Sequence, residues 1–222
     1  MIKTVIFDMD GLMFDTEQLS NEAWYAAAEK MGITIQQEML DSMKGVNRVG
    51  CDQIIRSWLG EDVHLEYLRN LKENYVEQRL KEKGVPVKKG LRELLSYLKT
   101  HKYKTVLATG TSDDKALNLL KMADVEKYFD HMVFGNMVEK CKPEPDIFLE
   151  AARRSYTLPA QCLVLEDSPN GIRAAHAAGC HIIMVPDGIP STPELEKITD
   201  DVMDSLEEVL EMFRLTDCSA VC

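Results

Sequence analysis

The sequence contains no apolar run of about 18 residues or more, the length that spans a bilayer. Its first residues lead directly into a strand-like segment, without the basic and then apolar stretches of a secretory signal. An excess of basic residues is also missing, because 26 Lys and Arg stand against 37 Asp and Glu, for a formal net charge of −11. Broad nucleic-acid binding depends on clustered basic side chains. We therefore expect neither a membrane nor a nucleic acid as partner.

The six cysteines form no C-x-x-C pair and are irregularly spaced. This pattern favours reduced thiols in a cytoplasmic protein. The five histidines show no spacing typical of metal ligands, and the chain has no internal repeat or low-complexity tract. With 45% hydrophobic and 28% charged residues among 222, the composition is that of an ordinary globular protein. The length suits one large domain, or a domain that carries a sizeable insertion.

Five short apolar runs, each bounded by polar residues or by Gly and Pro, are separated by helical patterns. They cover residues 2–7, 105–108, 132–134, 163–165 and 182–185. Nearly continuous apolarity is typical of strands that are buried on both faces of a parallel sheet. Helical stripes lie between them, for example Leu91, Leu94, Leu95 and Leu98. The alternation predicts an α/β fold with a doubly wound, Rossmann-like parallel sheet.

One stretch, from about residue 16 to residue 83, shows helical patterns only. It is too long for an ordinary crossover between two strands. We interpret it as an inserted, all-helical cap domain over residues 16–87, with the Rossmann-like catalytic core formed by residues 1–15 and 88–222. A linker that contains Gly84, Pro86 and Gly90 would return the chain to the core. Trp24 and Trp58 lie on the apolar stripes of the cap, and we expect both to be buried.

Polar segments follow the predicted strands at the points where these end. They are Asp8-Met9-Asp10-Gly11 after the first, Thr109-Gly110-Thr111-Ser112 after the second, and Glu166-Asp167-Ser168 after the fourth, with Lys142-Pro143-Glu144-Pro145-Asp146 between the third and the fourth. Ligands of open parallel sheets bind beyond the carboxyl ends of the strands. Each segment alone is typical of a turn or a helix cap. Together, the four predict a functional site at one edge of the sheet.

The residue types at this edge indicate phosphoryl transfer. Several carboxylates in one place repel one another, and a hard divalent cation such as Mg²⁺ relieves the repulsion. One carboxylate can attack phosphorus and form an acyl phosphate. A second carboxylate, two residues further on, can protonate the leaving oxygen and later deprotonate a water molecule. Thr109 and Lys142 can bind the phosphoryl oxygens and compensate their charge.

The segment Asp8-Met9-Asp10-Gly11-Leu12-Met13-Phe14-Asp15-Thr16 closely resembles the first signature of the haloacid dehalogenase (HAD) superfamily. Thr109 matches the second signature, Lys142 the third, and Glu166-Asp167 the fourth. Two longer strings, residues 142–148 (Lys-Pro-Glu-Pro-Asp-Ile-Phe) and residues 166–171 (Glu-Asp-Ser-Pro-Asn-Gly), are similar to those of a subgroup that contains β-phosphoglucomutase and many sugar-phosphate and nucleotide phosphatases. The resemblance covers nearly the whole chain, including the cap insertion.

The resemblance implies a role for each matching residue. Asp8 would be the nucleophile and Asp10 the general acid/base, while Thr109 and Lys142 would contact the phosphoryl group. The resemblance also implies a Mg²⁺ ion held by Asp8, the backbone carbonyl of Asp10, and Asp167, with Glu166 acting through water. The substrate-binding residues that it implies are Thr16, Arg48 and Gly110. The cap would close over the site and select the leaving group.

Departures from the subgroup's patterns separate the alternatives. Dehalogenases and phosphonate-cleaving relatives lack a carboxylate at the position of Asp10, so we disfavour both. The mutase shares Thr16 and the string Lys44-Gly45-Val46-Asn47-Arg48, but it has His where this chain has Ser20 and Lys where Ser112 stands.

The chain is therefore predicted to be a Mg²⁺-dependent phosphatase that acts on a small phosphorylated metabolite, a sugar phosphate or a nucleotide-like compound. A phosphosugar mutase is the alternative, and a non-catalytic protein that binds a phosphorylated ligand is a minor one. Family habit predicts a monomer.

Overall fold

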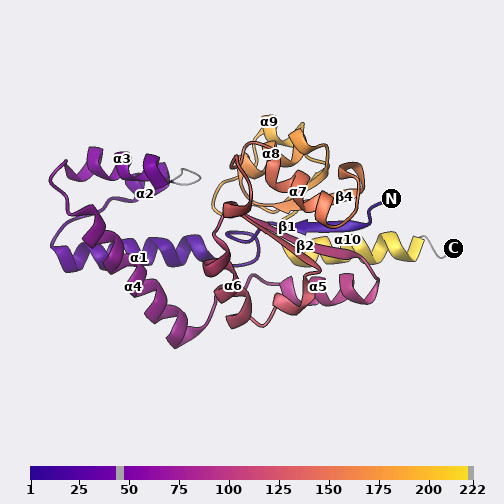
Figure 1. The fold of residues 1–222 in the computed structure, drawn as a ribbon, viewed down its shortest axis with the longest axis horizontal. Coiled ribbons are helices and arrows are strands. Elements are labelled where there is room, and N and C mark those ends of the chain that lie inside the picture. The colour runs from indigo at the N-terminus through magenta and orange to yellow at the C-terminus, as the bar shows by residue number, and fades with distance from the viewer. Residues whose placement is uncertain (44–47, 220–222) are drawn as a thin grey trace. The chain divides into compact units, whose positions relative to one another are not determined.

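The computed structural model of the chain describes residues 1–43 and 48–219 (Figure 1). The chain divides into two compact units, one formed by Met1–Asp15 with Val85–Cys222 and the other by Thr16–Gly84. Residues 85–87 belong to the first unit, where the amide of Asp15 donates to the carbonyl of Pro86 (2.8 Å) and Phe14 forms an isolated bridge with Val87.

The first unit is built around a six-stranded sheet in which every pairing is parallel, in the order β3-β2-β1-β4-β5-β6. The strands are β1 (Thr4–Phe7), β2 (Lys104–Thr109), β3 (His131–Phe134), β4 (Cys162–Glu166), β5 (His181–Met184) and β6 (Asp201–Val202). The five apolar runs of the sequence form β1 to β5. The sequence did not predict β6, because its two residues carry no apolar run.

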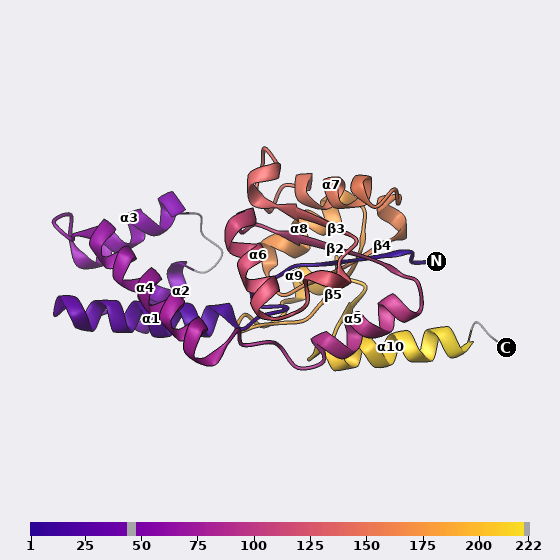
Figure 2. The same ribbon diagram turned by 60° about the horizontal axis from the view of Figure 1, so that its bottom comes forward.

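Helices cover both faces of this sheet, as Figure 1 and Figure 2 show. On one face lie α5 (Leu91–Thr100), α6 (Asp113–Met122) and α10 (Leu206–Ser219); on the other lie α7 (Asp146–Arg154), α8 (Pro169–Ala178) and α9 (Pro193–Glu196). The short 3-10 helices are η1 (Glu126–Tyr128), η2 (Gly135–Met137) and η3 (Pro159–Gln161). In β1, Val5 and Phe7 belong to the first hydrophobic core and Ile6 to the second, as alternation along a strand requires. The apolar runs therefore indicated strands buried on both faces correctly.

The strand order places the end of β1 at the topological switch point of the sheet. From β1 the chain proceeds to β2 and β3 on one side, and then returns to β4 on the other. In the registers, Phe7 lies opposite Leu107 of β2 and Leu165 of β4. The residues that follow these three positions therefore emerge together at the carboxyl edge, where ligands of such sheets bind.

The second unit is all helical and consists of α1 (Thr16–Met31), α2 (Gln37–Met43), α3 (Arg48–Leu59) and α4 (Leu65–Lys83). It has its own hydrophobic core, to which Trp24, Met39, Ile55 and Leu68 contribute. The predicted fold class, a doubly wound parallel sheet with an inserted all-helical domain, is confirmed.

The two tryptophans of the second unit differ in burial. Trp24 is buried as predicted, with 5% of its surface exposed. The prediction for Trp58 is wrong, since 45% of this residue is exposed. Trp58 follows Ile55 by one turn in the last turn of α3, but of these two residues only Ile55 joins the core.

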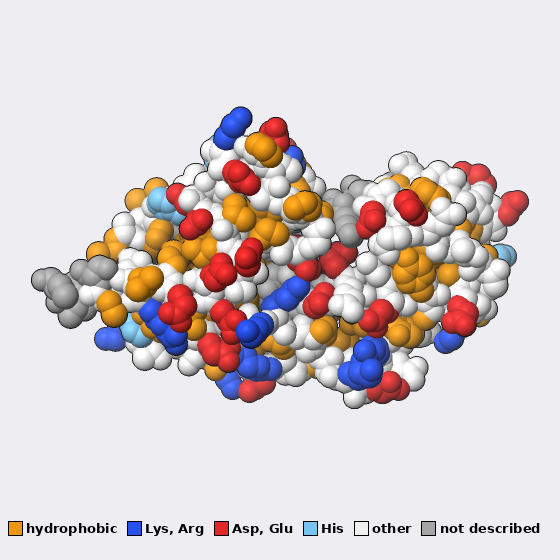
Figure 3. All heavy atoms as spheres, turned by 180° about the vertical axis from the view of Figure 1, so that it is seen from behind, with side chains coloured by type: hydrophobic (Ala, Val, Ile, Leu, Met, Phe, Trp, Pro, Cys, Tyr) orange, Lys and Arg blue, Asp and Glu red, His pale blue; other side chains and the backbone are white. Residues whose placement is uncertain are grey.

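Among the described residues, we find no helix that combines the length and the apolar character needed to cross a bilayer. On the face drawn in Figure 3, Lys and Arg side chains lie among Asp and Glu side chains rather than in one continuous basic area.

Candidate active site

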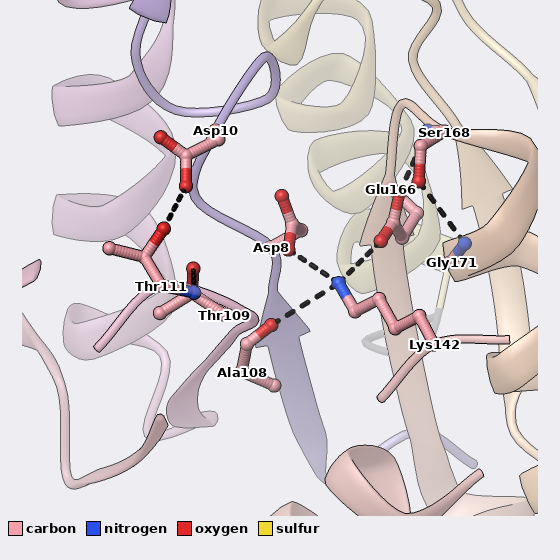
Figure 4. A network of polar contacts seen from close by, with 9 residues as sticks. All are labelled: Asp8, Asp10, Ala108, Thr109, Thr111, Lys142, Glu166, Ser168 and Gly171. Carbon is pink, nitrogen blue, oxygen red and sulfur yellow. Dashed lines mark hydrogen bonds and ion pairs between the residues drawn. The ribbon is translucent and has the colours of Figure 1, made fainter. Parts of the chain in front are cut away.

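Asp8 directly follows β1 and lies at the centre of the carboxyl edge of the sheet (Figure 4). Its amide donates a hydrogen bond to the carbonyl of Leu165 in β4 (3.1 Å), which fixes its backbone against the neighbouring strand. Asp8 is buried, with 7% of its surface exposed. A carboxylate in this position is held rigidly and is largely shielded from bulk water.

Lys142 links two carboxylates, that of Asp8 just after β1 and that of Glu166 at the end of β4. Its Nζ donates to Asp8 Oδ1 (2.5 Å) and to Glu166 Oε1 (2.6 Å), and it lies 3.5 Å from the carbonyl oxygen of Ala108. The same Nζ lies 5.0 Å from the centre of the Phe148 ring. Lys142 comes from the loop before α7, so three separate segments meet at one ammonium group, as the sequence predicted from the strand ends.

Glu166 is the last residue of β4 and is completely buried. Its Oε2 accepts hydrogen bonds from the amide (2.8 Å) and the hydroxyl (3.0 Å) of Ser168, while its Oε1 accepts from Lys142. The Ser168 hydroxyl in turn accepts from the amide of Gly171 (3.1 Å) and caps α8, in which Pro169 is the first residue. Both carboxylate oxygens of Glu166 are therefore held by donors from the protein.

Asp167 differs from Glu166 in its contacts. It is buried, with 8% of its surface exposed, and its Oδ1 has no hydrogen-bond partner. Such an oxygen costs about 1–3 kcal/mol in lost solvation unless a ligand or an ion satisfies it. Asp167 is thus the carboxylate of this cluster that has a buried oxygen without a hydrogen-bond donor from the protein.

The cluster carries more negative than positive charge, and this imbalance shifts its pKa values. Burial raises the pKa of Asp8 to about 7, against the attraction of Lys142 and with further contributions from Glu166 and Asp10. Burial and the negative charges of Glu166 and Asp8 raise the pKa of Asp167 to about 10. For Lys142, burial acts to lower the pKa, but the carboxylates of Asp8 and Glu166 outweigh it and raise the pKa. One ammonium does not compensate three buried carboxylates.

These residues fit a hard divalent cation. Asp8, Glu166 and Asp167 each offer a carboxylate oxygen, and the three oxygens lie within 4.8 Å of one another. An all-oxygen donor set with one or two direct carboxylates is the type that Mg²⁺ prefers. The unpartnered Oδ1 of Asp167 and the raised pKa values of Asp8 and Asp167 both indicate that positive charge is needed here.

Asp10 lies on the loop that follows Asp8 and is half-buried. The next residue, Gly11, has a φ of +84°, and its amide donates to the carbonyl of Phe14 (2.9 Å) to close a tight turn. A Cβ at Gly11 would lie 2.2 Å from Asp167 Oδ2, so only glycine permits both this turn and this close approach. The side chain of Asp10 does not point at Lys142; its Oδ2 accepts a hydrogen bond from the hydroxyl of Thr111 (2.7 Å).

Thr109 and Gly110 lie at the carboxyl end of β2, at the same edge of the sheet. Thr109 is the last residue of β2 and is buried, whereas Gly110 is exposed. The Oγ1 of Thr109 accepts a hydrogen bond from the amide of Thr111 (3.1 Å), which curls the loop over the end of the strand. The structure thus brings Asp8, Lys142, Glu166 and Asp167 into one buried cluster. Thr109 lies beside it at the end of β2, and Asp10 lies on the loop after β1.

Two predicted substrate-binding residues belong to the second unit. Thr16 is the first residue of α1 and is half-buried, and Arg48 is the first residue of α3. The side chain of Arg48 and the string from Lys44 to Asn47 lie outside the described residues. The contacts of Thr16 and Arg48 with a substrate therefore stay predictions.

Sequence reasoning missed the side-chain contacts of Thr111 and Ser168, and the need for a residue without a side chain at Gly171. All three belong to the strand-end segments or to the strings that carried the resemblance, but nothing in those strings assigned them a contact. Thr111 bonds to Asp10, Ser168 bonds to Glu166, and Gly171 packs directly beneath the Glu166 carboxylate.

The sequence matches a family model described as "Haloacid dehalogenase-like hydrolase" over residues 5–185. It is 36% identical to a phosphorylated carbohydrates phosphatase of Thermotoga maritima over 181 residues, which cover 80% of this chain and 82% of that protein. It is 28% identical to the β-phosphoglucomutase of Bacillus subtilis over 227 residues, which cover 97% of this chain and 99% of the mutase.

Solved structures resemble the whole fold. A Thermotoga maritima protein solved as a candidate β-phosphoglucomutase has a TM-score of 0.83 and 32% identity, with 96% of this chain and 99% of that chain covered. The β-phosphoglucomutase of Clostridium difficile has a TM-score of 0.76 and 26% identity, with 100% and 99% covered. The resemblance carried by the four strand-end motifs is confirmed.

Proposed function

Because the chain belongs to the haloacid dehalogenase-like hydrolase family, we propose that it is a Mg²⁺-dependent phosphatase of a small phosphorylated metabolite, a sugar phosphate or a nucleotide-like compound. The observation that carries the proposal is the position of Asp8, buried at the end of β1 against Lys142, with a second carboxylate, Asp10, on the same loop. These are the groups needed to form an aspartyl phosphate and then hydrolyse it.

The reaction has two steps. In the first, a carboxylate oxygen of Asp8 attacks phosphorus, the bond to the leaving oxygen breaks, and Asp10 gives its proton to that oxygen. In the second, a water molecule attacks the same phosphorus, the bond to Asp8 breaks, and Asp10 takes the proton of the water. Asp10 thus acts first as acid and then as base, and the enzyme returns to its starting state.

Lys142 and the loop after β2 bind the transferred group. The ammonium of Lys142 stays protonated because its pKa is raised, so it supplies a fixed positive charge beside Asp8. We assign the hydroxyl of Thr109 and the backbone amide of Gly110 to the remaining phosphoryl oxygens. All three groups act on charge that develops as phosphorus is transferred.

We propose that Asp8, Asp167 and the backbone carbonyl of Asp10 hold the Mg²⁺ directly, and that Glu166 acts through water. The unpartnered Oδ1 of Asp167 supports direct ligation by this residue. Lys142 and Ser168 already occupy both oxygens of Glu166, which supports an indirect role. When bound, Mg²⁺ supplies positive charge to the phosphoryl oxygens and to the crowded carboxylates.

The second unit, residues 16–84, is proposed to be the cap that excludes water and selects the leaving group, with Thr16 and Arg48 among its substrate-binding residues. Lids of this kind commonly complete a site and shield the reaction from water. A monomeric state, a cytoplasmic location, and the lack of nucleic-acid or membrane partners stay predictions from the sequence.

Hydrolysis is favoured over the phosphosugar mutase reaction by two observations. The phosphatase of Thermotoga maritima shares 36% of aligned residues with this chain, against 28% for the Bacillus subtilis mutase. This chain also has Ser20 and Ser112 where the mutase pattern has His and Lys. The mutase remains the second candidate, because its alignment covers nearly the whole chain.

The purified protein is expected to release phosphate from at least one member of a panel of phosphorylated metabolites in the presence of Mg²⁺. A chelator should abolish this release, and excess Mg²⁺ should restore it, because the buried carboxylates need a cation. Phosphate is measured colorimetrically across the panel, and the best substrate identifies the leaving group. Undiminished release in the chelator would refute the metal assignment.

The mutase alternative has its own test. With β-glucose 1-phosphate and a bisphosphate primer, the enzyme is expected to form no glucose 6-phosphate efficiently, because the groups that favour the mutase are replaced by serines. Formation of glucose 6-phosphate is followed by a coupled dehydrogenase assay, alongside free phosphate. Rapid conversion without phosphate release would reverse the ranking of the two functions.

A further inference from the structure

A hydrogen bond joins the loops that follow β1 and β2. The hydroxyl of Thr111 donates to Oδ2 of Asp10 at 2.7 Å, although the two residues are 101 positions apart in the sequence (Figure 4). The Asp10 side chain can accept this hydrogen bond when it is ionised and also, through its carbonyl oxygen, when it is protonated. The contact therefore orients the carboxylate of Asp10 relative to the strand-end cluster.

The backbone of Thr111 is fixed from both sides. Its amide donates to Oγ1 of Thr109 (3.1 Å), and its carbonyl accepts from the amide of Gly135 (3.1 Å). The following residue, Ser112, is the N-cap of α6, and its carbonyl accepts from the amide of Ala116 (3.0 Å). Since threonine is also stiff about χ1, its hydroxyl has a well-defined position.

The backbone of Asp10 is fixed as well. The amide of Gly11 donates to the carbonyl of Phe14 (2.9 Å), and the amide of Met13 donates to the carbonyl of Met9 (2.9 Å). With the main chain held in this turn, the direction of the Asp10 carboxylate depends on its side-chain torsions. A half-buried aspartate can adopt several of these, and the Thr111 hydroxyl favours one.

We propose that Thr111 is a positioning residue that holds the Asp10 carboxyl group in place for proton transfer; this inference rests on the proposed phosphatase activity. In the first step, a bond forms between phosphorus and Asp8, the bond from phosphorus to the leaving oxygen breaks, and the Asp10 proton moves to that oxygen. Thr111 exchanges no proton and touches no reacting atom. It acts only through Asp10.

The proposal predicts an effect that depends on the leaving group. An alkoxide needs a proton as it departs, whereas p-nitrophenolate leaves without one. The parameter kcat/KM reports the steps up to phosphoryl transfer, so it isolates this proton transfer from the later hydrolysis of the intermediate. A misplaced Asp10 should therefore slow alkyl phosphates more than p-nitrophenyl phosphate.

The test compares Thr111→Val with Thr111→Ser on p-nitrophenyl phosphate and on the best primary alkyl phosphate of the metabolite panel. For Thr111→Val, we expect kcat/KM to fall by about 10- to 100-fold on the alkyl phosphate and by less than about threefold on p-nitrophenyl phosphate. Thr111→Ser keeps the hydroxyl and should restore most of the loss. Thr111→Ala serves as the second variant if the valine variant does not fold.

Ser112→Ala is the matched control, because it removes a hydroxyl from the same loop that donates to Asp114 (2.5 Å) rather than to Asp10. It should leave the ratio of the two kcat/KM values unchanged. Equal losses on both substrates in the Thr111 variants, or no rescue by serine, would overturn the inference while the phosphatase stands. A wild-type enzyme that hydrolyses neither substrate in Mg²⁺ would overturn both.

Discussion

Asp8→Asn is expected to lower phosphate release by at least about 10³-fold while the protein stays folded. The amide that replaces the carboxylate can still accept a hydrogen bond from Lys142 but cannot attack phosphorus to form an acyl phosphate. Turnover of the best substrate is measured in Mg²⁺, and folding is checked by circular dichroism. Trapping of a phosphorylated enzyme should succeed with the wild type and fail with the variant.

The stability of Asp8→Asn follows from the pKa of Asp8. Burial raises this pKa from 3.8 to about 7, so the folded state binds a proton more tightly than the unfolded state does. The proton on Asp8 therefore contributes to the free energy of unfolding. This contribution is fully present below about pH 4 and is lost as the pH rises through about 7. Asparagine carries no such charge. In a chelator above about pH 7, the variant should therefore unfold at a temperature no lower than the wild type.

Asp200→Asn is the matched control for this substitution. Asp200 accepts a hydrogen bond from the amide of Ile182, the second residue of β5, and is half exposed, far along the chain from the strand-end motifs. Its variant should keep near-normal turnover. Near-normal rates in Asp8→Asn would exclude Asp8 as the nucleophile, and loss of turnover in both variants would point to a general effect of the substitution on the fold.

Much of the fold follows from short apolar runs, because strands buried on both faces leave a continuous hydrophobic signal. Residues 105–108 and 163–165 illustrate this, since they form the interior of β2 and β4. β6 leaves no such signal, because a two-residue strand at the edge pairs on one side only and needs no apolar run. Trp58 shows where the helical pattern fails. Such a pattern indicates which residues share a face of the helix, but not which of them a neighbouring helix covers.

Part of the candidate site could also be predicted from the sequence, because the order of the strands decides which segments meet at the edge of the sheet. Asp8, Lys142 and Glu166 meet because parallel strands end at one edge, and this could be inferred from their places after or between apolar runs. The contacts of Thr111 and Gly171 could not be inferred in this way. They depend on the direction of single side chains and on gaps of a few ångströms, which no spacing in the sequence encodes.

Gly171→Ala is expected to lower turnover by at least about 10²-fold and to lower the unfolding temperature by several degrees, as a buried clash would. Gly171 lies in the first turn of α8, and a Cβ there would be 1.7 Å from Glu166 Oε1 and 2.4 Å from Oε2. Glu166 cannot give way freely, because Lys142 and Ser168 hold both of its oxygens. One added methyl group should therefore displace Glu166 and release Lys142 from its bridging position.

Two comparisons identify the clash as the cause. Gly179→Ala, at the other end of α8, places its methyl group in open space at a φ of +76°. It should cost about 1 kcal/mol of stability without loss of turnover. The Glu166→Ala variant is itself expected to have low turnover. Adding Gly171→Ala to it should lower turnover and stability little further, because the carboxylate with which the new methyl group would clash is gone and the two effects are not additive. If Gly171→Ala costs as much in that background as in the wild type, the damage lies in the start of α8 itself, and Glu166 does not require a glycine beneath it.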